Sequence, residues 1–139
     1  MPRFTFKLEP LLNHRKQLEE RAQQTLAELL RQKLAIEDQL RRQQQGIARD
    51  KRTMAEALTG RVDVARIRGH ANQVNRATLT AQRGAFQLVD LNRRIDHARG
   101  QLAEAMRQRK AIEVLRDRRL KQWRREQDRR ETAALDELA

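Results

Sequence analysis

The chain has 139 residues, of which 36% are charged and 3% aromatic, and its formal net charge is +12. Ordinary globular domains have about 25% charged residues, so too few large apolar side chains remain here for a compact core. The absence of cysteine excludes disulfides and thiolate metal sites and fits a reducing compartment. No apolar run approaches the roughly 20 residues of a membrane span, and the start lacks a signal peptide's apolar segment. We therefore expect a soluble, cytoplasmic protein.

The first residues, "FTFKLEPLLNHRK", concentrate scarce apolar side chains. Phe4, Phe6 and Leu8 alternate with polar residues, and Pro10 biases the residue before it away from the helical region. Proline is tolerated in the first turn of a helix. We expect residues 1–9 to form an extended lead-in and a helix to begin at about residue 10.

One apolar stripe then runs through about residues 10–58, a stretch with a single glycine. Its members are spaced by alternating steps of three and four residues, which is typical of a coiled-coil seam: Ala22, Leu26, Leu29, Ile36, Leu40, Ile47 and Met54. Polar residues interrupt the stripe at Lys33, Gln43 and Asp50. A stripe of this kind needs a partner helix.

The pattern breaks at "LTGRVDVARIRGH", residues 58–70. Gly60 is a candidate C-terminal cap and Asp63 a candidate N-terminal cap. Gly69 adds a second weak point, and the acid-free stretch from Val64 to Val89 has only mild periodicity. We expect a reversal here, with a turn or short helix over about residues 59–70.

A second stripe marks a helix over about residues 71–136: Leu88, Leu91, Ile95, Ala98, Leu102, Ala105, Ile112 and Trp123. The small Ala98 and Ala105 would let a partner helix approach closely. Arg109 and Arg116 occupy seam positions, where their aliphatic stems cover apolar surface while the guanidinium reaches water.

Two stripes joined by a short break fold back most simply as a helical hairpin. The predicted fold is all-α: one coiled-coil domain over residues 1–139, built as a long antiparallel two-helix coiled-coil hairpin. A parallel homodimer would satisfy the same stripes.

The residue pattern favours no enzymatic site. His14, His70 and His97 follow no metal-ligand spacing, so each is interpreted as a solvated helix residue. Acidic residues are scattered beside Lys and Arg as expected for surface pairs, and the glycines form no phosphate-binding loop. We expect no catalysis, no cofactor, no metal and no small-molecule substrate.

The basic run at residues 107–130 has two interpretations of equal weight. It is either a docking face with Trp123 as its aromatic anchor or a solvated helix face with interleaved acids. Nucleic-acid binding is less favoured because aromatic stacking platforms are missing.

The lead-in has two interpretations as well. It is either a hydrophobic plug against the C-terminal helix, which explains its leucines, or a docking segment. Phe4 and Phe6 have little to bury against at the open end of a hairpin, so for them we expect a second protein to supply that surface.

The stretch Phe4–Lys16, with "AQQTLAEL" at 22–29 and the basic close "RKAIEVLRDRRLKQWRREQDRRETAALDELA" at 109–139, resembles the flagellar FliJ family. The resemblance implies a non-enzymatic, chaperone-like stalk of flagellar type III protein export, similar to the central stalk of rotary ATPases. It also implies a role in motility and chemotaxis and a cytoplasmic location, peripheral to the inner membrane at the flagellar base.

The partners implied by the resemblance are the export ATPase ring, the cytoplasmic domain of the export gate membrane protein and export chaperones. Carried over by position, the ATPase-binding residues are Phe4, Phe6, Leu8, Leu11, Leu12, Arg15, Arg116, Arg119, Leu120 and Trp123. The alternatives are a basic coiled-coil nucleic-acid binder, a dimeric structural coiled coil and the equivalent stalk of a virulence type III secretion system.

Overall fold

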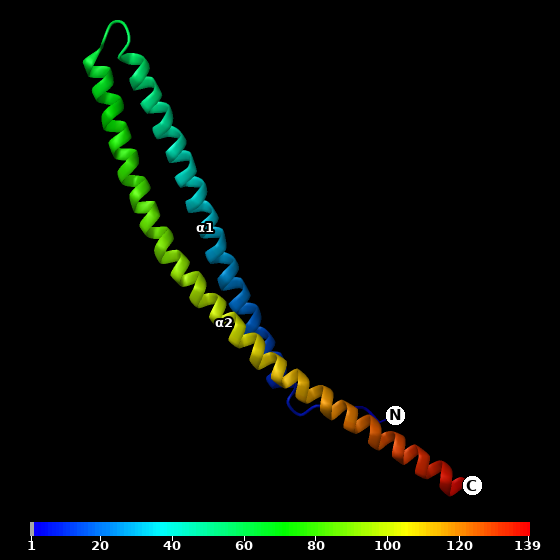
Figure 1. Cartoon of the computed structure of the whole chain (residues 1–139). Coiled ribbons are helices and arrows are strands. Elements are labelled where there is room, and N and C mark those ends of the chain that lie inside the picture. Colours follow the sequence, from blue (N-terminus) through cyan, green and yellow to red (C-terminus); the bar gives the residue numbers. More distant parts are fainter. Residues whose placement is uncertain (1) are drawn as a thin grey trace. The chain divides into compact units, whose positions relative to one another are not determined.

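The computed structural model describes residues 2–139 and contains two helices, α1 (Glu9–Ala57) and α2 (Val64–Leu138). The described residues include no strand. Across the helices, Glu9 contacts Arg116 and Asp50 contacts His70, so early residues of α1 meet late residues of α2. The helices are antiparallel, and the prediction of an all-α two-helix hairpin is confirmed (Figure 1).

The chain divides into two compact units, each made of one part of α1 and one part of α2. The terminal unit contains the chain up to Thr25 and Ala98–Ala139, and the hairpin unit contains Leu26–His97. Both chain ends therefore belong to the terminal unit. The prediction that the whole chain is one domain stays a prediction.

The start of α1 follows from the proline signal. The Glu9 amide donates to the Phe6 carbonyl at 3.1 Å, and the Leu12 amide donates to the Leu8 carbonyl at 2.9 Å. Pro10 lies in the first turn, where its missing N–H needs no intrahelical partner.

The turn between the helices is tied by local hydrogen bonds. The Thr59 hydroxyl donates to the Glu56 carbonyl at 2.7 Å, and Gly60 adopts a left-handed conformation with φ of 83°, which side-chain-bearing residues rarely occupy. An Asp63 carboxylate oxygen accepts from the amides of Ala65 at 3.1 Å and Arg66 at 3.3 Å, so Asp63 caps α2 as its sequence position indicated.

The second helix begins at Val64 rather than near residue 71. No separate short helix lies over 59–70, and Gly69 is inside α2. Gly84 and Gly100 are also helical, so α2 is continuous through all three. A helical glycine costs about 1 kcal/mol relative to alanine, which packing against α1 offsets in a long helix.

The core is thin, as expected when only two helices share it. Phe6, Leu12 and Ala98 are buried in the terminal unit, and Leu91 and Ile95 are buried in the hairpin unit. Most other seam residues of the described chain are half-buried.

The seam of the hairpin unit contains polar positions. His70 is half-buried, and its Nδ1 lies 3.5 Å from an Asp50 carboxylate oxygen. The interpretation of His70 as a solvated residue is therefore wrong, because its heptad position faces α1. His14 and His97 are exposed, as expected.

Candidate docking surface

The N-terminal segment before α1 packs against the C-terminal half of α2. The rings of Phe4 and Trp123 have centroids 6.1 Å apart and are tilted by 57°. The Arg116 guanidinium lies 5.9 Å from the Phe4 ring centroid, and the Arg119 guanidinium lies 5.6 Å from that of Phe6. Both distances are within cation–π range.

This packing corrects the expectation that a second protein must supply the surface on which Phe4 and Phe6 are buried. Phe6 is only 6% exposed and Phe4 is half-buried, so both phenylalanines find partners within the chain. Helix α2 extends well past the start of α1. Residues of α2 beyond Arg116, the partner of Glu9 at the start of α1, supply the surface that the lead-in covers.

All ten residues carried over from the family resemblance lie in the terminal unit, but they differ in accessibility. Phe6 and Leu12 are buried. Leu11 and Arg119 are exposed, and the others are half-buried: Phe4, Leu8, Arg15, Arg116, Leu120 and Trp123. A partner could therefore reach part of the set only.

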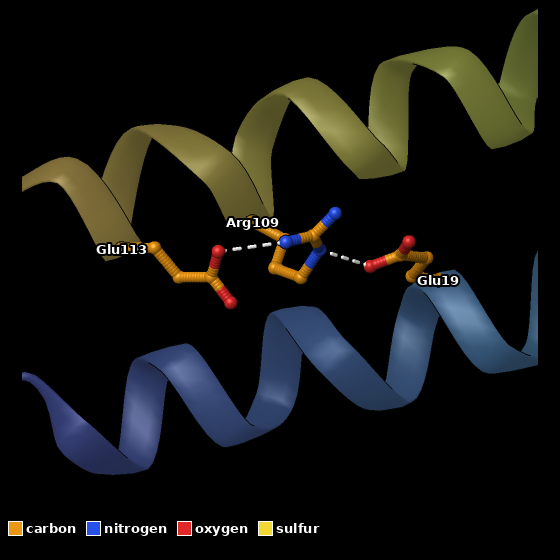
Figure 2. A network of polar contacts seen from close by, with 3 residues as sticks. All are labelled: Glu19, Arg109 and Glu113. Carbon is orange, nitrogen blue, oxygen red and sulfur yellow. Dashed lines mark hydrogen bonds and ion pairs between the residues drawn. The ribbon is translucent and has the colours of Figure 1, made fainter.

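A ladder of polar contacts joins the helices of the terminal unit. Arg109 projects from α2 between Glu113 of the same helix and Glu19 of α1, and it donates to both carboxylates (Figure 2). Arg116 donates to Glu9 at 3.0 Å, and Arg15 donates to Gln108. These pairs fix which residues of α1 face which residues of α2.

The charge of Arg109 is favoured by this arrangement. Its pKa is raised above the ordinary value, chiefly by the hydrogen bond with Glu19 and also by the attraction of Glu113, while desolvation acts in the opposite direction. A seam arginine with a carboxylate on each side is thus a satisfied structural residue.

The last turns of α2 have no cover within the described chain. Every residue from Asp128 to Ala139 is exposed, including Leu135 and Leu138, the latter at 85%. Sequence reasoning did not select these leucines because they fall outside the seam register. Their three-residue spacing, which places both on one side of the helix, was the available signal.

The hairpin unit exposes a second set of apolar side chains. Leu34 follows the seam residue Lys33 by one position, and Val89 follows the seam residue Leu88 by one. In an antiparallel pair these flanking positions lie on the same side of both helices. Phe86, 77% exposed, lies beside Val89 on α2. We call Leu34, Phe86 and Val89 the hairpin face; sequence reasoning missed it.

The surface hollows of the described chain follow the helices. One of about 380 Å³ in the terminal unit is lined by residues of both helices, among them Leu18, Ala22 and Ala105. Among residues 2–139 there is no cluster of metal-ligating side chains. No helix in this range is both long and apolar enough to cross a membrane.

These features define a class: a two-helix coiled-coil protein whose exposed apolar and basic side chains are suited to binding other macromolecules. Residues 4–139 match the family model described as flagellar FliJ protein, and the chain belongs to this family. It is therefore a component of the flagellar type III export apparatus. Searches of curated proteins and of solved structures found no match.

Proposed function

We propose that this protein is a non-enzymatic stalk of flagellar export whose terminal unit docks on the export ATPase ring. The observation that carries the proposal is the uncovered C-terminal part of α2, which follows directly on the Phe4–Trp123 cluster. Both chain ends contribute to this unit, and tryptophan and arginine are the residue types that dominate protein interfaces.

Burial divides the ten candidate residues into two roles. Phe6 and Leu12 hold the segment and α1 against α2, because little of either is accessible. Leu11 and Arg119 are available for direct contact, as are the exposed edges of Phe4 and Trp123. We add Leu135 and Leu138 to the contact set.

We assign the remaining family partners, the export gate and export chaperones, to the hairpin face. Leu34, Phe86 and Val89 are exposed without serving the seam. An aromatic and two aliphatic side chains on adjacent helices suit an amphipathic partner helix or a shallow protein groove. Contact with the gate would hold the protein at the inner membrane, at the flagellar base.

The test is a pull-down of the purified export ATPase by the full chain, with the ATP hydrolysis rate measured with and without the chain. Leu135→Ser with Leu138→Ser should weaken ATPase binding about tenfold or more, since burying two leucines contributes roughly 3 kcal/mol. Leu34→Ser with Phe86→Ser is the matched control and should leave ATPase binding unchanged. Equal binding by all three proteins would refute the assignment.

The charge of +12 gives one specific reason to test nucleic-acid binding as a second candidate function. A real nucleic-acid interface should survive near physiological salt, with affinity falling steeply as salt rises. Binding that is seen only at low salt would reflect general attraction between opposite charges.

A further inference from the structure

The connection between α1 and α2 carries apolar side chains where turns usually carry polar ones. Leu58 and Val62 lie in the connection and Val64 begins α2, and each is between 50% and 63% exposed. Turns favour Gly, Pro, Asn, Asp and Ser for conformational reasons. Gly60 and Asp63 already meet the conformational needs of this turn, so the three aliphatic residues require another explanation.

The turn presents these side chains on an ordered backbone. The Leu58 amide donates to the Ala55 carbonyl at 3.3 Å, and the Thr59 amide donates to the Glu56 carbonyl at 3.2 Å. Together with the Asp63 cap, these bonds hold the segment from both sides. A partner would therefore meet a preformed surface, with little ordering of the backbone left to oppose binding.

Cations surround the aliphatic side chains. Four exposed arginines flank or occupy the turn: Arg52, Arg61, Arg66 and Arg68. The nearby acids are fewer. Asp63 is engaged in capping, Glu56 precedes the turn, and α2 contains no acid from Val64 to Val89. This end of the hairpin unit thus combines exposed aliphatic groups with excess positive charge.

We propose that this turn contacts an anionic phospholipid surface. Leu58, Val62 and Val64 would enter the boundary between headgroups and acyl chains, while the arginines would bind lipid phosphates. The turn lies at the tip of the hairpin unit (Figure 1), where its side chains can reach a bilayer surface. It also lacks the aromatic anchors typical of protein interfaces.

The inference rests on the proposed location at the inner membrane and is independent of ATPase docking. The test uses single cysteines carrying an environment-sensitive dye, which is direct because the chain has no cysteine of its own. Val62→Cys reports on the turn, and Leu135→Cys in the terminal unit is the control. Vesicles of phosphatidylcholine are compared with vesicles that also contain phosphatidylglycerol.

The Val62→Cys label should shift its emission to the blue on phosphatidylglycerol-containing vesicles only, and the Leu135→Cys label should not. An unchanged Val62→Cys label, or the same shift at both positions, would overturn the proposal.

Vesicle sedimentation with unlabelled variants distinguishes binding through the turn from general electrostatic attraction between the basic chain and anionic lipid. Replacing Leu58, Val62 and Val64 by Ser together should weaken binding about tenfold or more. Replacing Arg61, Arg66 and Arg68 by Gln should do the same. Replacing Arg124, Arg125 and Arg129 by Gln removes the same charge from the terminal unit and should change binding much less. Equal losses from both arginine sets would contradict a specific site.

Two further outcomes distinguish the proposals. If the turn variants keep full vesicle binding but lose binding to the cytoplasmic domain of the export gate, the turn is a protein contact and the lipid proposal is wrong. If the parent chain binds vesicles but not the ATPase, the stalk function fails while the lipid contact stands.

Discussion

Arg109 shows how single residues set the pairing of the helices. It occupies a seam position that an apolar residue would fill in a simpler coiled coil, and carboxylates of Glu19 and Glu113 lie on either side. Polar seam residues specify register at a cost in stability. The side chain of Glu19 is 12% exposed, so it depends on Arg109 for its partner.

Arg109→Leu alone should therefore destabilise the fold, because it leaves Glu19 in the seam without its cation. The double change Arg109→Leu with Glu19→Leu should recover the loss and equal or exceed the parent, because two apolar seam residues avoid the desolvation that this half-buried ion pair incurs. Urea unfolding of the parent, both single variants and the double variant measures the coupling. If the double variant lost as much unfolding free energy as the two single variants together, the proposed coupling between Arg109 and Glu19 would be contradicted.

The same pair makes a prediction about pH. Because the pKa of Arg109 is raised in the folded state, its contribution to stability is fully present below the ordinary arginine pKa and is lost only as pH rises through the raised value. That window is strongly alkaline. Variation in stability across neutral pH should therefore be the same in the parent and in Arg109→Leu with Glu19→Leu, as urea unfolding at several pH values would show.

Three glycines should respond differently to alanine. A Cβ at Gly100 meets nothing within 4 Å, so Gly100→Ala should stabilise α2 by about 1 kcal/mol. A Cβ at Gly84 would lie 2.9 Å from a Leu40 methyl, so Gly84→Ala should gain less. Gly60 has φ of 83°, so Gly60→Ala should cost about 1–2 kcal/mol. Thermal unfolding gives the order; a Gly60→Ala protein as stable as Gly100→Ala would contradict it.

At this scale the sequence predicted the roles of Asp63 and Pro10, because each has a conformational preference independent of the rest of the fold. Gly60 adopts the left-handed conformation that glycine favours, but it lies in the connection, three residues after α1 ends at Ala57. The sequence did not predict the burial of Phe6 or the pairing of His70. Both depend on which residues of the opposite helix lie alongside, and periodicity alone leaves that alignment undetermined.

At the scale of elements, α2 depends on its N-terminal cap. Asp63 satisfies two amides of the first turn, and replacing such a cap by alanine costs about 1 kcal/mol. Asp63→Ala should lower stability by that amount and increase hydrogen exchange over the first turns of α2. Asp63→Ser should retain most of the stability, and a loss as large as that of Asp63→Ala would exclude capping as the cause.

The helix boundaries were predicted from the sequence only in part. The beginning of α1 and the existence of two stripes were evident from Pro10 and the three-and-four spacing. The beginning of α2 was placed too late because Gly69 was treated as a break, whereas packing and the Asp63 cap carry the helix through it. The exposed leucines of the last turns, Leu135 and Leu138, lie off the seam, so the seam pattern does not indicate them.

At the scale of the whole molecule, the two stripes are satisfied within one chain. The turn over residues 58–63 folds α2 back along α1, with the seam contacts Glu9–Arg116, Glu19–Arg109 and Asp50–His70. We therefore expect a monomer, and light scattering of the purified protein should give a mass near 16.4 kDa. A mass of twice that value, independent of concentration, would favour the parallel homodimer.

We propose that the terminal unit, and not the hairpin unit, binds the export ATPase. The most direct measurement is a titration of the ATPase against the parent chain, Leu135→Ser with Leu138→Ser, and Leu34→Ser with Phe86→Ser, with helicity checked by circular dichroism. We expect a loss of about tenfold or more for the first variant alone. Normal binding by that variant, with the loss appearing in the hairpin-face variant, would show that the terminal unit is not the ATPase-binding surface.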